Sequence, residues 1–179
     1  MKPKRNNANV PAADEIYTPA SAVRPILPYL PSGTVWESSD FGASEITKVI
    51  KDSGRNVIGS HKKDGLDFFL YEPEKWDVQV TNPPYSIKDK WIKRSFELQK
   101  PFFLLLPLES LAGIKRAAMF KRYPAGALIL QDRVNFILAT KKVANWFSSM
   151  WLIGNIKDFA GRIEWIATEN ACQGDFFRG

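Results

Sequence analysis

The sequence has one cysteine and one histidine among its 179 residues. A lone cysteine, Cys172, excludes an internal disulfide and a zinc site built from cysteine thiolates. With only His61 to add to it, the chain is too poor in sulfur and nitrogen ligands for us to expect a structural metal.

Long apolar runs are also missing. The longest spans only residues 102–106, whereas a transmembrane helix needs about 20 apolar residues. The N-terminal residues contain no apolar core of the kind found in signal peptides. We therefore expect no membrane segment and a cytoplasmic protein.

The composition is that of a globular protein. A hydrophobic fraction of 45% over this length suits one domain with a sizeable core. We place it at residues 14–179, after a basic, polar arm at residues 1–13 that is either a disordered terminus or a phosphate contact. The net charge of +6 favours an anionic partner, nucleic acid above all.

The most informative stretch is a short β-rich run followed by two prolines. Val78 and Val80, within residues 76–81, suit a buried strand. The following Asn82-Pro83-Pro84-Tyr85 cannot continue a strand or a helix, because proline fixes φ and lacks a backbone donor. The pattern predicts a rigid corner at the carboxyl edge of a sheet, where open α/β sheets bind their ligands.

Asn82-Pro83-Pro84-Tyr85 resembles the catalytic motif of S-adenosylmethionine-dependent amino-methyltransferases. That family includes the N6-adenine-specific DNA and RNA methyltransferases and the glutamine methyltransferases of release factors. The resemblance implies that the Asn82 side-chain oxygen and the Pro83 carbonyl accept hydrogen bonds from the target amino group. It also implies that Pro84 completes the corner and that Tyr85 stacks on the planar target.

Strand and helix patterns alternate along most of the chain, which predicts an α/β fold with a mostly parallel sheet. We expect strands at residues 33–37, 54–61, 76–81 and 100–108, helices at 45–52, 87–99 and 109–123, and short β runs at 127–130, 134–138, 151–153 and 162–167. The runs at residues 127–130, 134–138 and 151–153 are expected at the antiparallel end of the sheet, and residues 162–167 are expected to form one more strand. The resemblance extends from Tyr17 to Phe147 and implies the Rossmann-like class I methyltransferase fold.

The same resemblance implies S-adenosyl-L-methionine as cofactor. Tyr17-Thr18-Pro19 is similar to the family's N-terminal cofactor motif, which lies against the methionine end of the donor. The alternative interpretation is a plain helix start, with Thr18 as the cap and Pro19 in the first turn.

A second cofactor element is expected after the strand at residues 33–37. By the resemblance, Glu37, Asp40 and Gly42 belong to the turn that faces the positively charged end of the donor. Gly42 is the only one of the family's usual glycines to remain, and His61 stands near the place of a ribose-binding acid, with Asp64 three residues on. These departures leave open the alternative that the chain is a relative of this family that binds nucleic acid without the cofactor.

Asp67 and Phe68 match the third cofactor element of the family. There the aspartate accepts from the adenine amino group of the donor and the neighbouring apolar side chain covers the ring. The alternative is an aspartate that flanks a strand beside core aromatics.

Candidate target contacts come from two regions. Phe136, next to Arg133, is the first candidate to pack against an extruded base, with Trp146 and Phe147 behind it; core packing is the alternative for each ring. Lys88 and Lys90, on the helix at residues 87–99, are candidate phosphate contacts or simply a solvated face.

Together these features predict methyl transfer to the exocyclic N6 amino group of adenine in DNA or RNA. Two alternatives stay open. One is another planar amino group, either protein glutamine or cytosine N4. The other is an inactive relative that binds nucleic acid.

Overall fold

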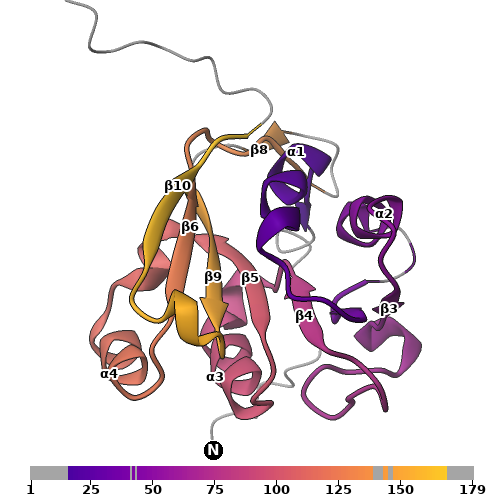
Figure 1. Cartoon of the computed structure of the whole chain (residues 1–179), viewed down its shortest axis with the longest axis horizontal. Helices are drawn as coiled ribbons and strands as arrows, with labels where there is room; N and C mark the ends of the chain where they lie inside the picture. The colour runs from indigo at the N-terminus through magenta and orange to yellow at the C-terminus, as the bar shows by residue number, and fades with distance from the viewer. Residues whose placement is uncertain (1–15, 41, 43, 139–142, 145–146, 169–179) are drawn as a thin grey trace, which may run out of the picture.

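The centre of the computed structural model is a seven-stranded mixed sheet flanked by helices, as predicted (Figure 1). The structure describes residues 16–40, 42, 44–138, 143–144 and 147–168. From one edge to the other the sheet contains β10 (Ile163–Ile166), β6 (Gly126–Leu130), β9 (Ser149–Gly154), β5 (Phe102–Pro107), β4 (Val78–Thr81), β2 (Val35–Glu37) and β3 (Val57–Gly59).

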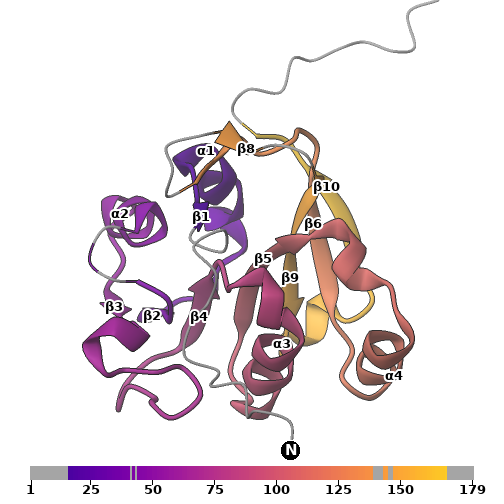
Figure 2. The same ribbon diagram turned by 180° about the vertical axis from the view of Figure 1, so that it is seen from behind.

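Helices cover both faces of this sheet (Figures 1 and 2). One face packs against α1 (Ala20–Val23), the 3-10 helix η2 (Arg24–Tyr29) and α2 (Glu45–Asp52). The other face packs against α3 (Lys88–Glu97) and α4 (Ile114–Arg122). Further 3-10 turns are η3 (Lys62–Asp64), η4 (Tyr85–Ile87), η5 (Leu108–Leu111) and η6 (Lys157–Phe159). Within the described part of the chain, no helix is long and apolar enough to cross a lipid bilayer.

β5 is the core strand that the sequence predicts, because all of its residues are buried. Its side chains alternate between two hydrophobic cores. Phe103 and Leu105 join the core under α1 and α2, whereas Phe102, Leu104 and Leu106 join the core under α3 and α4.

The direction of the chain across the sheet reverses at β2. β3 pairs in parallel with β2 on one side and β4 pairs in parallel with it on the other. The loops that leave the carboxyl ends of β2 and β4 therefore diverge to opposite faces, which opens a crevice between them. In open α/β sheets such a switch point is where ligands bind.

The prediction of an antiparallel end of the sheet is confirmed for β9, which runs antiparallel to both β5 and β6. The prediction was wrong for residues 134–138. β7 (Phe136–Leu138) instead forms a small separate sheet with β1 (Ile16–Tyr17) and β8 (Val143–Ala144). β9 already fills the space between β5 and β6, so this short strand pairs with the N-terminal segment, with Tyr17 opposite Ile137.

One buried hydrogen bond ties the N-terminal segment to the sheet. The indole Nε1 of Trp151, on β9, donates to the Ala22 carbonyl of α1 at 2.8 Å. Both side chains are fully buried. Because α1 is only one turn long, this contact and its apolar packing fix where residues 17–19 lie.

We expect Trp151→Phe to lower the free energy of unfolding by about 1–2 kcal/mol, because phenylalanine keeps most of the ring but removes the donor to Ala22. Urea denaturation checks this. Trp165→Phe is the matched control, since that indole is 65% exposed and its loss is expected to change stability by less than about 0.5 kcal/mol. Equal effects of the two substitutions would contradict the anchoring role of Trp151.

Candidate functional site

The carboxyl ends of β2 and β4 are joined by side-chain hydrogen bonds. Glu37 and Thr81, the last residues of these strands, are both buried. The Thr81 hydroxyl donates to Glu37 Oε1 at 2.5 Å, and the Ser39 backbone N–H donates to the same oxygen at 3.0 Å. The Ser39 hydroxyl lies 2.7 Å from the Thr81 hydroxyl and 3.2 Å from the Asn82 carbonyl oxygen. This network holds the switch point together.

Glu37 is a buried acid with an altered proton affinity. Its other oxygen, Oε2, accepts from the Ser44 hydroxyl at 2.7 Å. Burial raises the pKa of Glu37 from about 4.5 to about 7, and the nearby Asp40 adds to the rise, although hydrogen bonds from Thr81, Ser44 and Ser39 oppose it. Near neutral pH this carboxyl group therefore changes charge easily.

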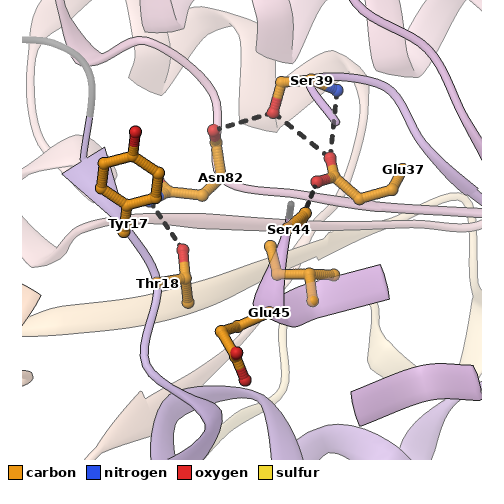
Figure 3. Close-up of a pocket in the computed structure, with 8 residues that line it drawn as sticks. Tyr17, Thr18, Glu37, Ser39, Ser44, Glu45 and Asn82 are labelled. Carbon is orange, nitrogen blue, oxygen red and sulfur yellow. Dashed lines mark hydrogen bonds between the residues drawn. The ribbon is translucent and has the colours of Figure 1, made fainter. Parts of the chain in front are cut away.

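A cavity with about 340 Å³ of empty space, partly open to solvent, lies at this point. Figure 3 shows its lining, which brings together the N-terminal segment, the β2 turn, the start of α2 and the Asn-Pro-Pro-Tyr corner. The described lining residues are Tyr17, Thr18, Glu37, Ser39, Ser44, Glu45, Ile46 and Asn82. The structure thus gathers Tyr17, Thr18, Glu37 and Asn82, four of the predicted site residues, around one cavity.

Asn82 holds a buried acceptor beside this cavity. Its Nδ2 donates to the Thr18 hydroxyl at 3.0 Å, which orients the amide. Its Oδ1 is buried and accepts no hydrogen bond from the residues that the structure describes. Buried polar atoms are nearly always hydrogen-bonded, to protein or to water, so an acceptor without a partner among the described residues has room for a further donor. Thr18 therefore orients the amide, and no described residue donates to its oxygen.

The plain helix cap considered for Thr18 is wrong. The N-cap position of α1 is Pro19, with extended backbone and no side-chain cap bond. Thr18 lies one residue too early to cap the helix, and its hydroxyl bonds to Asn82 instead. Pro19 is not among the described lining residues, and its role as a cofactor contact stays a prediction.

Asp40 anchors the turn between β2 and α2. Its Oδ1 accepts from the backbone N–H of Gly42 at 2.8 Å and of Ser44 at 3.1 Å, and its Oδ2 accepts from the Thr47 hydroxyl at 2.5 Å. Gly42 has φ +96°, a conformation that favours glycine. These bonds shape the turn that presents Ser44 to Glu37, and direct cofactor contacts by Asp40 and Gly42 stay predictions.

Asp67 and Phe68 lie outside the described lining of the cavity. Asp67 Oδ1 accepts from the Phe69 N–H at 2.9 Å. The Phe68 ring stacks on Trp91, with centroids 4.0 Å apart and planes 10° apart, in a core cluster with Trp36 and Trp76. These contacts match the alternative of an aspartate beside core aromatics, and the adenine-binding role of the pair stays a prediction.

A row of three aromatic rings leads away from the motif. Phe147 meets Tyr85 edge-on at a centroid distance of 5.6 Å and lies nearly parallel to Phe136 at 5.5 Å. Phe136 is fully buried. Phe147, a candidate ranked behind Phe136 on the sequence, is the ring that contacts the motif tyrosine. Trp146 lies outside the described residues.

The candidate cations are partly or fully exposed. Lys88 donates from Nζ to the Tyr85 carbonyl at 3.3 Å, which places its charge next to the motif. Lys90 and Arg133 are exposed. Their contacts with phosphate stay predictions.

Sequence reasoning missed the hydroxyl groups that complete the site, Ser39, Ser44 and Thr81. A signal for them exists, because a serine-rich turn follows β2 and a threonine immediately precedes the motif asparagine. Their function depends on a buried carboxylate between two strand ends, and only the folded structure shows that arrangement.

We expect Glu37 to make the protein less stable as the pH rises. Its folded pKa, about 7, exceeds its ordinary value near 4.5, so between these values the folded state holds a proton that the unfolded state has lost. Its contribution to the free energy of unfolding therefore falls by up to roughly 3 kcal/mol as the pH rises through this window. Denaturation at pH 5 and pH 8 should show this fall in the native chain and not in Glu37→Gln.

Glu45→Gln is the control for that comparison, because Glu45 lines the same cavity with a side chain that is 42% exposed. It should keep the pH profile of the native chain. Parallel profiles for Glu37→Gln and the native chain would show that Glu37 is not the group responsible.

Among known proteins, only solved structures are similar to this chain. No family model matches the chain, and no curated protein matches it. Among solved structures, the chain is similar to a protein of Vibrio vulnificus YJ016 described as a modification subunit of a type I restriction enzyme, with 13% identity and a TM-score of 0.47. The similarity covers 79% of this chain and 44% of that one, so this chain spans less than half of its length. A shared activity does not follow from this likeness.

Proposed function

We propose that this site transfers a methyl group from S-adenosylmethionine to the exocyclic N6 amino group of adenine in DNA or RNA. The observation that supports this most is the buried Asn82 Oδ1, which is held in an Asn-Pro-Pro-Tyr corner and accepts no bond from the described residues. The N–H of a substrate amino group is a suitable donor to this oxygen.

The chemistry requires orientation more than proton removal. An exocyclic amino group is a weak nucleophile, because its lone pair is delocalised into the ring. Asn82 Oδ1 and the Pro83 carbonyl accept its two N–H groups, so that the lone pair points out of the ring plane towards the methyl group. Holding reactants in such a geometry is one of the larger sources of rate enhancement.

The cavity suits the charged end of the cofactor. S-adenosylmethionine, when bound, supplies an electrophilic methyl group on a sulfonium. The Glu37 carboxylate and the hydroxyls of Ser39 and Ser44 provide acceptors for an ammonium group. The location at the switch point agrees with ligand binding in other α/β sheets.

Nucleic acid is the substrate class that the surface favours. The net charge is +6, and Lys88 lies beside the motif with Lys90 and Arg133 exposed. Tyr85, which follows the prolines, is the ring on which an extruded base would stack. A base inside a duplex cannot reach this corner, so the target must be single-stranded or flipped out.

The direct test is incubation with labelled S-adenosylmethionine and DNA or RNA, followed by nucleoside analysis for N6-methyladenine. Asn82→Ala is expected to lower kcat by at least about 100-fold, because the amino group is no longer oriented. Calorimetry should show cofactor affinity within about threefold of the native chain, because the substitution removes an amino-group acceptor and leaves the Glu37 carboxylate in place.

Three results would contradict the proposal. One is the absence of transfer to any DNA or RNA. Another is label only on cytosine N4 or on protein glutamine, which would keep the reaction and change the substrate. The third is tight nucleic-acid binding without measurable cofactor affinity, which would favour a binding protein.

Thr18 is expected to act as a positioning residue for Asn82. Thr18→Val keeps the shape of the side chain but removes the acceptor for Asn82 Nδ2, so the amide can rotate and kcat should fall about 10-fold or more. Thr18→Ser retains the hydroxyl and should stay within about threefold of the native rate. If valine and serine act alike, the hydroxyl does not orient the amide.

A further inference from the structure

The strand β10 forms one edge of the main sheet. Among the described strands it pairs only with β6. The backbone carbonyls of Arg162 and Ile166 accept hydrogen bonds from the β6 side. Alternate residues of a strand direct their backbone groups to opposite sides. The N–H and C=O groups of Ile163 and Trp165 therefore face the open edge.

The same two residues carry exposed apolar side chains. Ile163 is 52% exposed and Trp165 is 65% exposed. They are in register with Ala127 and Ile129 of β6, which puts them on the face that α3 and α4 cover further into the sheet. Monomeric proteins usually protect an edge with lysine, proline, a bulge or a very short strand. β10 is short, with four residues, and contains neither lysine nor proline.

Charge does not protect this edge either. The one acid on the strand, Glu164, forms an ion pair with Arg162, two residues earlier. The pair leaves the strand without net charge, which offsets the repulsion that Glu164 would otherwise exert on a like strand. An edge with exposed isoleucine and tryptophan and a neutralised acid is one that favours association.

We propose that β10 pairs with β10 of a second copy of this chain, antiparallel and about a twofold axis at Glu164. This inference is independent of the methyl-transfer proposal. In this register Ile163 of one copy lies opposite Trp165 of the other, and the same pair forms again across the axis. Each outward N–H then meets an outward C=O, and the two sheets become continuous.

The strand that pairs with this edge is β10 of a second copy, because the edge is complementary to itself. A twofold interface needs the same patch on both partners, and the order Ile163-Glu164-Trp165 places a β-branched residue opposite an aromatic one in both directions, a favourable cross-strand pair. A register shifted by one residue would turn these side chains to opposite faces. The edge is short, so the interface is smaller than about 1,200 Å² and its dissociation constant is expected in the micromolar range.

Sedimentation equilibrium on the full chain tests this over about 1–500 µM. We expect a reversible dimer in the native chain and a dissociation constant at least tenfold higher for Trp165→Lys. Leu70→Lys is the matched control, because Leu70 is also a large exposed apolar residue (89%) on another segment, and it should dimerise like the native chain. A native chain that stays monomeric throughout, or a dimer that Trp165→Lys leaves intact, overturns the proposal.

Crosslinking tests the register. In a chain that also carries Cys172→Ser, Glu164→Cys places two thiols at the axis, in a narrow pair whose Cα atoms lie about 4.5 Å apart, which suits a disulfide. Oxidation should link Glu164→Cys into covalent dimers and leave a Leu70→Cys control in the same background monomeric on a non-reducing gel. Equal linking of the two variants, or none in Glu164→Cys, overturns the pairing at Glu164.

Discussion

The hydrogen bond from Thr81 to Glu37 is the contact on which the candidate site depends. It joins the last residues of two parallel strands, and the β2 turn and the motif corner both begin at those strand ends. Ser39 and Ser44 bind the same carboxyl group from the β2 side. Asn82 follows Thr81 directly, so its position is set by the strand and by the two prolines that come after it.

Two features of this site cost stability. A carboxyl group is kept away from water at Glu37, and the amide oxygen of Asn82 has no donor among the described residues. Burying such groups is unfavourable unless they are paired. Their presence side by side at a switch point fits a site that binds a cation and a hydrogen-bond donor, because both ligands would offset the cost.

The sequence predicts the sheet well and the site only in part. The buried β5, the strand before the prolines and the helix at residues 45–52 all follow from local patterns, because periodicity and proline act over a few residues. The partner of β7 does not follow, since a three-residue run carries no information about which strand it meets. The same limit applies to Thr18, whose hydroxyl bonds to an amide 64 positions away.

The bond between Trp151 and Ala22 also has a consequence for the order of assembly. It spans 129 positions in the sequence, so its partners meet only after nearly the whole chain has been synthesised. Domains dominated by such distant contacts fold slowly, because the loop between the partners must close first. In the folded state the N-terminal segment therefore depends on β9 as well as on Asn82 for its position. On the ribosome, residues 82–85 are therefore synthesised well before Trp151, the residue that anchors the N-terminal segment beside them.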